Sequence, residues 1–584
     1  MCQGKKRILI IENVSTFRAS LKRSLEADGY EVLEAATADE GRERLAQEWV
    51  HLALVDVRAR TPEVDESDDE SGLDLIRDKA HPSYGVIPRL ILTAYPEWDK
   101  VKRALAPDEN GITPAEDFLV KGVDSPEEIL RKVEETIERW WSPRLDIDWE
   151  ASTPICLASF LEPEEKWQDG EHLEVSAREL GALLCRAYAN EPQIRKLSIR
   201  RVRRGHARTF IAFARTHLDD AIAGREDVLK CGPREVIEQE IENYREYVRP
   251  HTHQIHVQRV SQTTKYATIR YNPAGGRLGA CETFKDFYRD SQVEEIKALL
   301  TRLFRGEGTP LRTWYHERRV QKETHEGRDI FAHYNQTLKV ARRERKRQIN
   351  GRGPIERLLT SLEKGGQLGI RVERHRNTLT VHVTNFGAFA VSDFMALVRG
   401  EKTLPLPAPH WWGVTHGDLN GENILVDEQG TPWLIDFERT GWGPAFRDAA
   451  ELESVIRWEL LRTNNMRDIV IFEEVLLKAA LQSGEQTESL VDNNGGEWSD
   501  DLKKAARVIL HLRDLLGAMY GRGPRMYQEY LVGMFFYALR FVSKDGITSP
   551  GQVRSPIVRK THALLSALRI AHIAQNGWQE LQNE

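Results

Sequence analysis

The chain carries the stretch His416-Gly417-Asp418-Leu419-Asn420-Gly421-Glu422-Asn423, followed twelve residues later by Ile435-Asp436-Phe437-Glu438. It reads H-G-D-x-x-x-x-N, then a hydrophobic run, then D-F. This spacing predicts a phosphoryl-transfer site in which Asp418 orients an attacking hydroxyl, while Asn423 and Asp436 hold Mg²⁺ against nucleotide phosphates. Apolar runs flank the turn at 427–430, which predicts two short strands around the motif. The alternative interpretation is a chance polar turn in a hairpin.

The H-G-D form of this motif resembles that of kinase-like phosphotransferases of the aminoglycoside and choline kinase type, which share the protein kinase fold. The resemblance implies an α+β two-lobed domain that uses ATP and Mg²⁺ as cofactors. It implies that Asp418 is the catalytic base and that Asn423 and Asp436 are metal ligands. It also implies that His416 is a buried support for the loop and that Asp448 is structural.

Residues 448–453 read D-x-A-x-L-E. Together with the H-G-D motif, this segment loosely resembles the kinase-like ternary-complex-associated domains of bacterial multi-component effector systems. The resemblance implies protein partners within such a system.

A kinase-like domain needs a nucleotide clamp upstream of the catalytic motif. Residues 197–217 alternate apolar and polar side chains on both sides of 204–207, which predicts a hairpin. Gly205 is the single glycine in this turn, so the hairpin departs from a glycine-rich loop. Gly205 and His206, with backbone N–H groups, are therefore the candidates for contact with the phosphates.

A third expected strand ends at Lys230, and Pro233 opens a helix predicted over 233–248. A strand lysine paired with a helix glutamate is the device that places the lysine on the α- and β-phosphates. Glu240 is the first candidate for the partner of Lys230, and Glu238 is the second. The alternative is an unrelated lysine on a surface strand. Residues 268–272 are a candidate hinge strand between the lobes.

The first 141 residues have a second signature. Apolar strands are expected at 7–13, 52–56, 90–93 and 117–121, with helical patterns between them. This alternation predicts a parallel α/β sheet whose active groups lie at the carboxyl ends of the strands. Polar side chains stand at those ends, namely Glu12, Asn13, Asp56, Thr93 and Lys121.

This pattern resembles the receiver domain of two-component response regulators, a doubly wound sheet of five parallel strands. The resemblance implies that Asp56 is the phosphoacceptor and that Glu12 and Asp56, more weakly Asn13, bind Mg²⁺. It implies that Thr93 and Lys121 contact the phosphoryl oxygens and that Phe118 is the switch aromatic. It also implies a phosphodonor partner such as a sensor histidine kinase. The alternative is an unreactive receiver-like module, which the replacement of a second acid by Asn13 favours because it removes a negative charge from the metal site.

The length of 584 residues suits three or four domains. The expected boundaries follow from composition and breaker residues: a receiver at 1–141, a linker at 142–170, a kinase-like small lobe at 171–305, an insert and lobe connection at 306–410, and a large lobe at 411–584. An acidic loop at 58–72 is expected to be solvated or to dock a basic partner.

The formal net charge of −7 gives no global signature of nucleic-acid binding. The five cysteines show no C-x-x-C spacing, which indicates a reducing compartment. The most apolar run, 530–539, is too short to span a bilayer and ends at Arg540. A cytoplasmic protein without membrane contact is therefore expected.

A basic run lies inside the expected insert and contains Arg342, Arg343, Arg345, Lys346 and Arg347. It is interpreted either as a solvated helical face or as a contact for a polyanion or substrate. Further on, 502–520, 527–542 and 558–574 have the apolar period of helices and are expected to complete the large lobe.

Two functions remain open from these residues. The first is a Mg²⁺-dependent phosphotransferase that moves the ATP γ-phosphate under the control of the receiver. The second is a pseudokinase scaffold that binds nucleotide and relays the state of the receiver to protein partners. The acceptor remains open between a small-molecule hydroxyl, a protein and a nucleotide.

Overall fold

The computed structural model describes residues 5–59, 69–94, 98–109, 111–141, 145–205, 208–219, 222–252, 255–273, 281–316, 321–323, 329–365, 368–406, 410–479, 489, 491–492, 498–544 and 554–579. The chain divides into two compact units: unit 1 comprises 1–241 and 255–279, and unit 2 comprises 242–254 and 280–584. Most of the expected acidic loop, 60–68, and the candidate His206 lie outside the described residues. Of the helices that the structure describes, none combines the length and the apolar composition of a membrane span.

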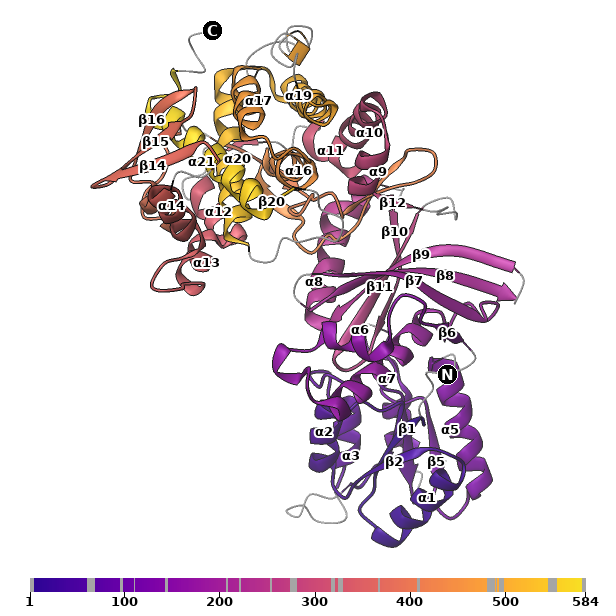
Figure 1. Cartoon of the computed structure of the whole chain (residues 1–584). Helices are drawn as coiled ribbons and strands as arrows, with labels where there is room; N and C mark the ends of the chain where they lie inside the picture. The colour runs from indigo at the N-terminus through magenta and orange to yellow at the C-terminus, as the bar shows by residue number, and fades with distance from the viewer. Residues whose placement is uncertain are drawn as a thin grey trace. The chain divides into compact units, whose positions relative to one another are not determined.

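Unit 1 begins with a sheet of five parallel strands in the order β2-β1-β3-β4-β5 (Figure 1). Helices α1 and α5 pack on one face of this sheet, and α2, α3 and α4 pack on the other. Strands β1, β3 and β4 are nearly continuous apolar runs and fully buried, because both of their faces are covered. The elements are β1 (Arg7–Ile11), α1 (Ser15–Ala27), β2 (Glu31–Ala35), α2 (Ala38–Gln47), β3 (Leu52–Asp56), α3 (Ser71–Arg77), β4 (Arg89–Thr93), α4 (Trp98–Leu105), β5 (Asp117–Val120) and α5 (Pro126–Trp141).

The rest of unit 1 is built on a sheet of six strands in the order β10-β11-β9-β8-β7-β6. Helices α6 and α7 contribute Leu157, Leu180 and Leu184 to its core, together with Leu197 and Leu229 of the sheet. The elements are β6 (Asp146–Asp148), α6 (Pro154–Leu161), η1 (Glu164–Lys166), α7 (Gly170–Ala187), β7 (Lys196–Arg204), β8 (Phe210–Asp219), β9 (Ile222–Pro233), α8 (Arg234–Asn243), β10 (Ile255–Gln262) and β11 (Tyr266–Pro273).

The structure differs here from the linker predicted for 142–170. From Leu145 onward these residues form the edge strand β6, which pairs in parallel with β7, and the helix α6, whose Leu157 and Leu161 are buried. Pro154 occupies the first turn of α6, and the hydroxyl of Thr153 accepts the N–H of Cys156. A proline at this position starts a helix, so it did not mark a linker.

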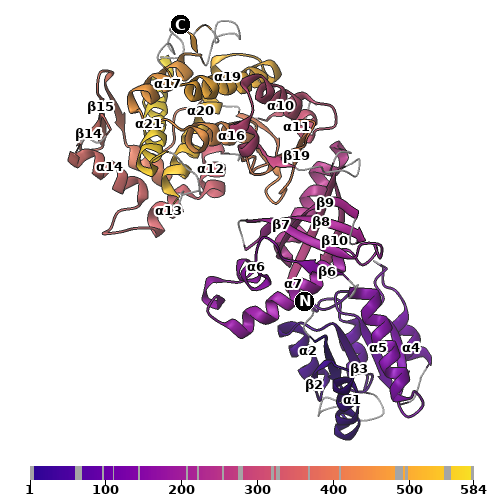
Figure 2. The same cartoon turned by 45° about the vertical axis from the view of Figure 1, so that its right-hand side comes forward.

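Unit 2 is mainly helical and is organised around α20 (Figure 2). Every residue of α20 from Met526 to Ser543 is buried. Helices α12, α13, α14, α16 and α21 pack against α20. Apolar side chains surround most of α20, which suits a helix in the middle of a fold, and its buried polar residues include Gln528, Glu529 and Arg540. The helices that the structure describes in unit 2 are η2 (Tyr244–Val248), η3 (Arg249–His251), α9 (Phe284–Asp290), α10 (Val293–Arg305), α11 (Pro310–His316), α12 (Ile330–Leu338), α13 (Val340–Lys346), α14 (Pro354–Gly365), α15 (Phe394–Arg399), α16 (Arg447–Ser454), η4 (Val455–Leu460), α17 (Met466–Lys478), α19 (Asp500–Tyr520), α20 (Pro524–Ser543) and α21 (Pro556–Gln575).

Three small sheets complete unit 2, with strand orders β12-β18-β19, β13-β17-β20 and β14-β15-β16. The segment expected as an insert at 306–410 contributes α12, α13 and α14 to the packing around α20, and β16 lies against α21. It therefore shares the core of unit 2. The strands are β12 (Glu282–Thr283), β13 (Gln321–Glu323), β14 (Ile370–His375), β15 (Thr378–Val383), β16 (Gly387–Ser392), β17 (His410–Thr415), β18 (Ile424–Val426), β19 (Pro432–Leu434) and β20 (Gly441–Pro444).

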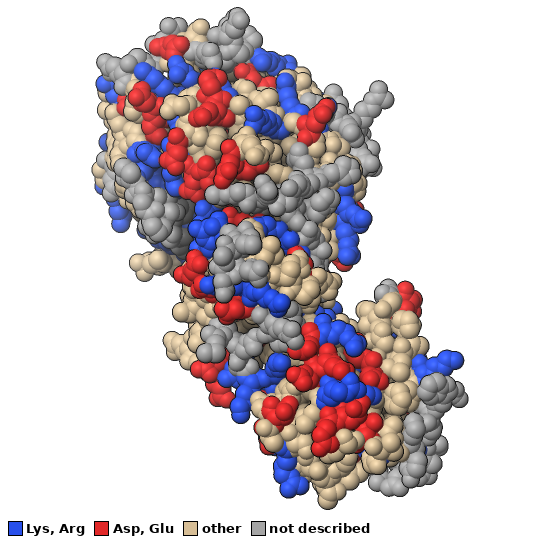
Figure 3. All heavy atoms as spheres, turned by 90° about the vertical axis from the view of Figure 1, so that its right-hand side faces the viewer, with Lys and Arg blue, Asp and Glu red and all other residues tan. Residues whose placement is uncertain are grey.

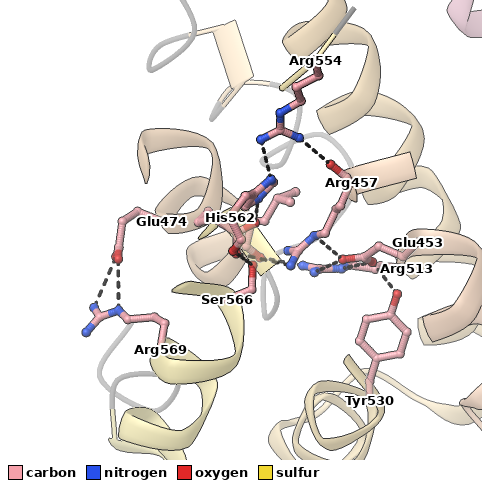
Figure 4. A network of polar contacts seen from close by, with 11 residues as sticks. Glu453, Arg457, Glu474, Arg513, Tyr530, Arg554, His562, Ser566 and Arg569 are labelled. Atoms are coloured by element: carbon pink, nitrogen blue, oxygen red, sulfur yellow. Dashed lines mark hydrogen bonds and ion pairs between the residues drawn. The ribbon is translucent and has the colours of Figure 1, made fainter. Parts of the chain in front are cut away.

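Buried ion pairs tie the helices of unit 2 together (Figure 4). Glu453 on α16 pairs with Arg457 at 2.9 Å and with Arg513 of α19 at 2.7 Å. His562 of α21 hydrogen-bonds a carboxylate oxygen of Glu473 on α17 at 2.6 Å as a neutral imidazole, because burial lowers the pKa of His562 to about 4. Removing one partner of an ion pair such as Glu453–Arg513 leaves an uncompensated buried charge, so these pairs fix how the helices pack.

The surface carries both signs of charge. On the face drawn in Figure 3, acidic and basic side chains lie interspersed over its described part. This agrees with the small formal net charge of −7.

Candidate functional site

The carboxyl ends of β1, β3 and β5 bring Glu12, Asp56 and Lys121 together. The Nζ atom of Lys121 lies 2.6 Å from Oε2 of Glu12 and 2.9 Å from Oδ2 of Asp56. Glu12 is fully buried and Asp56 is 4% exposed. Burial, and next the charge of Asp56, raise the pKa of the Glu12 carboxyl. Two buried acids are thus held close together, with one ammonium group between them.

These acids fit the magnesium ion that the receiver resemblance implies. Mg²⁺ in proteins is usually held by one or two carboxylates together with water and substrate phosphate, so Glu12 and Asp56 are a sufficient protein set. Among the described residues, no group of three or more His, Cys, Asp and Glu side chains is arranged to hold a metal ion. Asn13 directly follows Glu12 in the loop after β1 and is partly buried.

Thr93 and Phe118 lie on the neighbouring strand ends. Thr93 ends β4 and is buried, and its carbonyl accepts the N–H of Lys121 at 2.8 Å. Phe118 is partly buried against the core, with the ammonium of Lys132 5.5 Å from its ring centroid. The sheet therefore places the backbone of Thr93 beside that of Lys121, and Phe118 on the adjoining strand; their roles toward a phosphoryl group stay a prediction.

Unit 1 also contains a junction between the five-stranded part and the six-stranded part. A guanidinium nitrogen of Arg186 on α7 donates to the carbonyls of Val86 and Gln262, each at 2.7 Å. The same guanidinium lies 4.5 Å from the ring centroid of Trp140 on α5. Arg234, the first residue of α8, donates to the carbonyl of Pro82 at 2.8 Å. The start of α8 is thus bonded directly to the five-stranded part.

Lys230 and Glu240 form a buried ion pair. The Nζ atom of Lys230, on β9, lies 2.5 Å from Oε2 of Glu240 on α8, and both side chains are fully buried. The hydroxyl of Tyr271 donates to the other oxygen of Glu240. Glu238, the second candidate partner, pairs with Arg234 at 2.6 Å instead. The structure thus places the lysine on the third antiparallel strand and its glutamate on the following helix.

Gly205 closes the hairpin between β7 and β8. Its N–H donates to the carbonyl of Thr209 at 2.7 Å, and a Cβ at this position would lie 2.2 Å from the Thr209 hydroxyl oxygen. The tight approach to Thr209 explains the glycine without any ligand. The candidate role of Gly205 in phosphate contact stays a prediction.

In unit 2, Asp448 holds the backbone of the H-G-D loop. Its two carboxylate oxygens accept the N–H of His416 at 2.7 Å and of Gly417 at 2.8 Å, and the Tyr315 hydroxyl donates to it at 2.6 Å. Gly417 has a φ of 81°, and a Cβ there would lie 2.2 Å from the carbonyl oxygen of Arg439. Only glycine fits this position.

His416 is fully buried beneath the loop. Its Nε2 lies 3.1 Å from the carbonyl oxygen of Ile435, so the hydrogen of the ring is on Nε2. Burial lowers the pKa of His416, which keeps the imidazole neutral. The histidine thus ties the H-G-D loop to the strand that precedes Asp436.

The three residues predicted for phosphoryl transfer lie on this loop system. The amide nitrogen of Asn423 donates to the carbonyl of Asp418 at 2.8 Å and lies 3.5 Å from Oδ2 of its carboxylate. The N–H of Ile435 donates to the carbonyl of Asn423 at 3.1 Å, and Asp436 follows with a left-handed φ of 71°. Since the amide nitrogen of Asn423 is turned to Asp418, its oxygen is the end suited to a metal ion. An amide oxygen and a carboxylate fit Mg²⁺.

Two arginines that the sequence analysis did not assign reach the other side of Asp418. Arg439 lies 3.5 Å and Arg540 lies 3.6 Å from Oδ1 of Asp418. Arg540 also pairs with Glu451 of α16 at 2.5 Å. Burial, and next the charge of Asp418, raise the pKa of Glu451 to about 7. Arg540 could have been found from the sequence, because it is a charged residue within the apolar period of 527–542, where a buried partner is needed; it was predicted only as the end of an apolar run.

Comparison with known proteins gives one family match, which lies in the second half of the chain. The family model described as "Ternary complex associated domain 9" matches residues 339–543. None of the curated proteins matches the chain. The matched segment contains the H-G-D loop, the basic run at 342–347 and α20.

Solved receiver structures are also similar to this chain. A response regulator receiver domain protein (CheY-like) from Methanospirillum hungatei JF-1 is 30% identical, with 23% of this chain and 95% of that chain covered and a TM-score of 0.19. A response regulator from Thermotoga maritima is 22% identical, with 23% and 99% covered and a TM-score of 0.19. The N-terminal region resembles CheY-like receivers, and its strand order, β2-β1-β3-β4-β5, is the CheY-type order.

Proposed function

We propose that the chain is a receiver-containing signalling protein whose second part transfers the γ-phosphoryl group of ATP to a hydroxyl, with Mg²⁺ as cofactor. The observation that carries the proposal is the placement of Asp418, Asn423 and Asp436 on one loop system held by Asp448. The buried pair of Lys230 and Glu240 supports it, because kinases position the α- and β-phosphates with such a pair.

In the proposed reaction, the acceptor oxygen attacks the γ-phosphorus, the bond to the β–γ bridging oxygen breaks, and ADP leaves. Asp418 orients the hydroxyl and accepts its proton. Asn423 and Asp436 would hold Mg²⁺, which supplies charge stabilisation to the phosphates when it is bound. Lys230, in unit 1, is the candidate for contact with the nucleotide phosphates that the kinase resemblance implies.

In the receiver, a carboxylate oxygen of Asp56 would attack the phosphorus of a phosphodonor, the bond between that phosphorus and the donor would break, and the dephosphorylated donor would leave an aspartyl phosphate at Asp56. Lys121, which already pairs with Asp56, would then bond the new phosphoryl oxygens, together with Thr93. The added charge is a local switch. The hydrogen bond from Arg234 to the carbonyl of Pro82 is the proposed link from this switch to the pair of Lys230 and Glu240. Arg234 is the first residue of α8, the helix that carries Glu240.

The test is ATP turnover by the full chain, compared between wild type, Asp418→Asn and Glu428→Gln. Glu428 is an exposed carboxylate in the turn between β18 and β19, which follows the H-G-D loop, and it is the matched control. Water replaces the missing acceptor, so wild type and control are expected to hydrolyse ATP slowly, and Asp418→Asn is expected to lose this activity. Equal turnover in Asp418→Asn and wild type would contradict the enzymatic function.

One observation favours the second candidate, a pseudokinase scaffold. The Oδ1 atom of Asp418 lies between the guanidinium groups of Arg439 and Arg540, which compete with a hydroxyl for the carboxylate. A scaffold would bind ATP and Mg²⁺ in calorimetry, show no turnover with any acceptor, and still change its protein partners when the receiver binds beryllofluoride. Turnover lost in Asp418→Asn would exclude it.

A further inference from the structure

The carboxylate of Asp418 has two chemically different sides. Its Oδ2 atom faces the amide of Asn423, a residue proposed to hold the metal ion. Its Oδ1 atom faces the guanidinium groups of Arg439 and Arg540. The acceptor hydroxyl must reach Asp418, so the arginine side is the side that its other groups would meet.

Helix α13 packs against α20 and carries a further cation, Arg343, on which the charges of Arg540 and Arg439 act. Arg343 is partly buried and donates to the carbonyl of Leu338 at 2.8 Å. Burial, and next the charges of Arg540, Arg347 and Arg439, lower the pKa of Arg343 to about 10. Within the described part of the chain, no carboxylate lies within ion-pair distance of Arg343. Its charged neighbours are cations, which is unfavourable unless an anion joins them.

The carboxyl end of α20 completes the group. A guanidinium nitrogen of Arg347 donates to the carbonyl of Ser543 at 3.3 Å, so the end of α13 touches the end of α20. The next residue is Lys544, whose pKa is lowered to about 8 by burial and next by Arg540. We call Arg343, Arg347, Arg439, Arg540 and Lys544 the cationic cluster.

The acidic neighbours of the cationic cluster are already engaged. Glu451 pairs with Arg540 at 2.5 Å, and Glu459 pairs with Lys285 at 2.7 Å. Asp418 is the third carboxylate whose charge acts on Arg540 and Lys544, and the proposed reaction uses it. Among the described residues, the five cations of the cluster thus outnumber these three carboxylates.

The cationic cluster is built into the fold. Glu344 of α13 is buried and accepts the N–H groups of Ile355 and Glu356, each at 3.0 Å, at the start of α14. A Cβ on Gly353 would lie 2.3 Å from the Glu344 side chain, so α13 and the chain before α14 are in close contact. Arg342 and Arg345 of the same basic run are exposed. The helix thus turns Arg343 inward and leaves its neighbours in solvent.

We propose that the cationic cluster binds a phosphate group carried by the acceptor, so that the hydroxyl phosphorylated at Asp418 belongs to a phosphate monoester. Guanidinium groups bind phosphate through paired hydrogen bonds, and a dianion is the ligand best matched to several converging cations. This assignment rests on the proposed function. A cationic acceptor, such as an aminoglycoside or choline, would be repelled from the same side.

Calorimetric titration of the full chain tests the cluster without relying on turnover. The probes are inorganic phosphate, glycerol 3-phosphate and a phosphoserine peptide. Inorganic phosphate tests binding of the phosphate group alone, glycerol 3-phosphate represents a small-molecule monoester, and the peptide represents a phosphorylated protein. We expect saturable binding of glycerol 3-phosphate or the peptide, with competition from inorganic phosphate. Arg343→Gln and Arg347→Gln are expected to weaken it by about tenfold each, as for the loss of a charge-assisted hydrogen bond. Arg342→Gln, exposed on the same helix, is the matched control and should bind like wild type.

A parallel assay supplies ATP, Mg²⁺ and each probe and follows product formation by mass spectrometry. Phosphorylation of a phosphate-bearing probe, lost in Arg343→Gln and kept in Arg342→Gln, is the expected result. Absence of saturable binding in a chain that still hydrolyses ATP would overturn the proposal, as would phosphorylation of choline or an aminoglycoside in its place. Equal binding by Arg343→Gln and Arg342→Gln would also overturn it. Phosphate binding that depends on Arg343 in a chain without turnover would refute the acceptor role together with the proposed function, and leave an anion site.

Discussion

Replacing Glu240 by glutamine should lower the local stability of unit 1 far more than the loss of an ordinary surface ion pair would. Both side chains are fully buried, and Lys230 Nζ lies 2.5 Å from Glu240. Glu240→Gln keeps the shape and an oxygen that accepts the Tyr271 hydroxyl, but it leaves the ammonium of Lys230 buried and unpaired. Loss of one partner of a buried pair costs about 3–5 kcal/mol.

The control is Glu238→Gln on the same helix. The side chain of Glu238 is 40% exposed and pairs with Arg234 at 2.6 Å. Pairs of this kind are worth about 0–1 kcal/mol. The double variant Lys230→Met with Glu240→Gln removes the unpaired charge, so most of the lost stability should return.

Hydrogen exchange followed by mass spectrometry, on peptides from β9 and α8 of the full chain, measures the local opening free energy. Exchange in Glu240→Gln should accelerate by about a hundredfold or more, since each 1.4 kcal/mol corresponds to a factor of ten. The control should stay near wild type. The reasoning is refuted if Glu240→Gln exchanges like Glu238→Gln. In the double variant, near-normal exchange with lost ATP affinity would assign the lysine to nucleotide binding.

Three further outcomes are expected. Asp448→Asn should lower ATP turnover with little change in ATP affinity, measured by steady-state kinetics and calorimetry, because one of the two loop N–H groups would face an amide nitrogen instead of an oxygen. Burial lowers the pKa of His562 from 6.5 to about 4, so its contribution to stability is present above pH 6.5 and is lost as pH falls through about 4; His562→Gln should flatten the pH dependence of urea unfolding between these values by up to about 3 kcal/mol. Beryllofluoride should change ATP turnover severalfold in wild type, and both Asp56→Ala and Arg234→Ala should suppress that response, while a response that survives Arg234→Ala would exclude the bond to Pro82 as its route.

The proximity of side chains was easiest to predict from the sequence where regular secondary structure alone brings them together. Glu12, Asp56 and Lys121 each follow a strand of one parallel sheet, and such strand ends share one edge. The pairing of Lys230 with a glutamate of the next helix is similarly local, since ten residues separate it from Glu240.

The residues that were missed depend on tertiary packing. Arg540 lies in α20, and its distance to Asp418 is set by how that helix packs in unit 2. Arg343 belongs to a basic run in which the sequence does not show which side chain turns inward; the contact of Glu344 with the start of α14 decides it. The linker predicted for 142–170 was wrong for a different reason. Pro154 begins the buried helix α6, whereas the prediction took proline in this segment as a sign of irregular structure.

The H-G-D motif shows why a short pattern can be informative although the proposed reaction uses the side chain of only one of its residues. His416 is required as a neutral buried tie to Ile435, and Gly417 is required by its φ of 81° and by the close carbonyl of Arg439. Asp418 is the single member whose carboxylate faces both the amide of Asn423 and the arginines. Because Asp448 fixes the backbone of the loop, the acidic oxygen is aimed by groups that never touch a substrate. Under the proposed function, the same loop could serve acceptors of different charge, and Arg439 and Arg540, which lie next to Oδ1 of Asp418, are the side chains proposed to select among them.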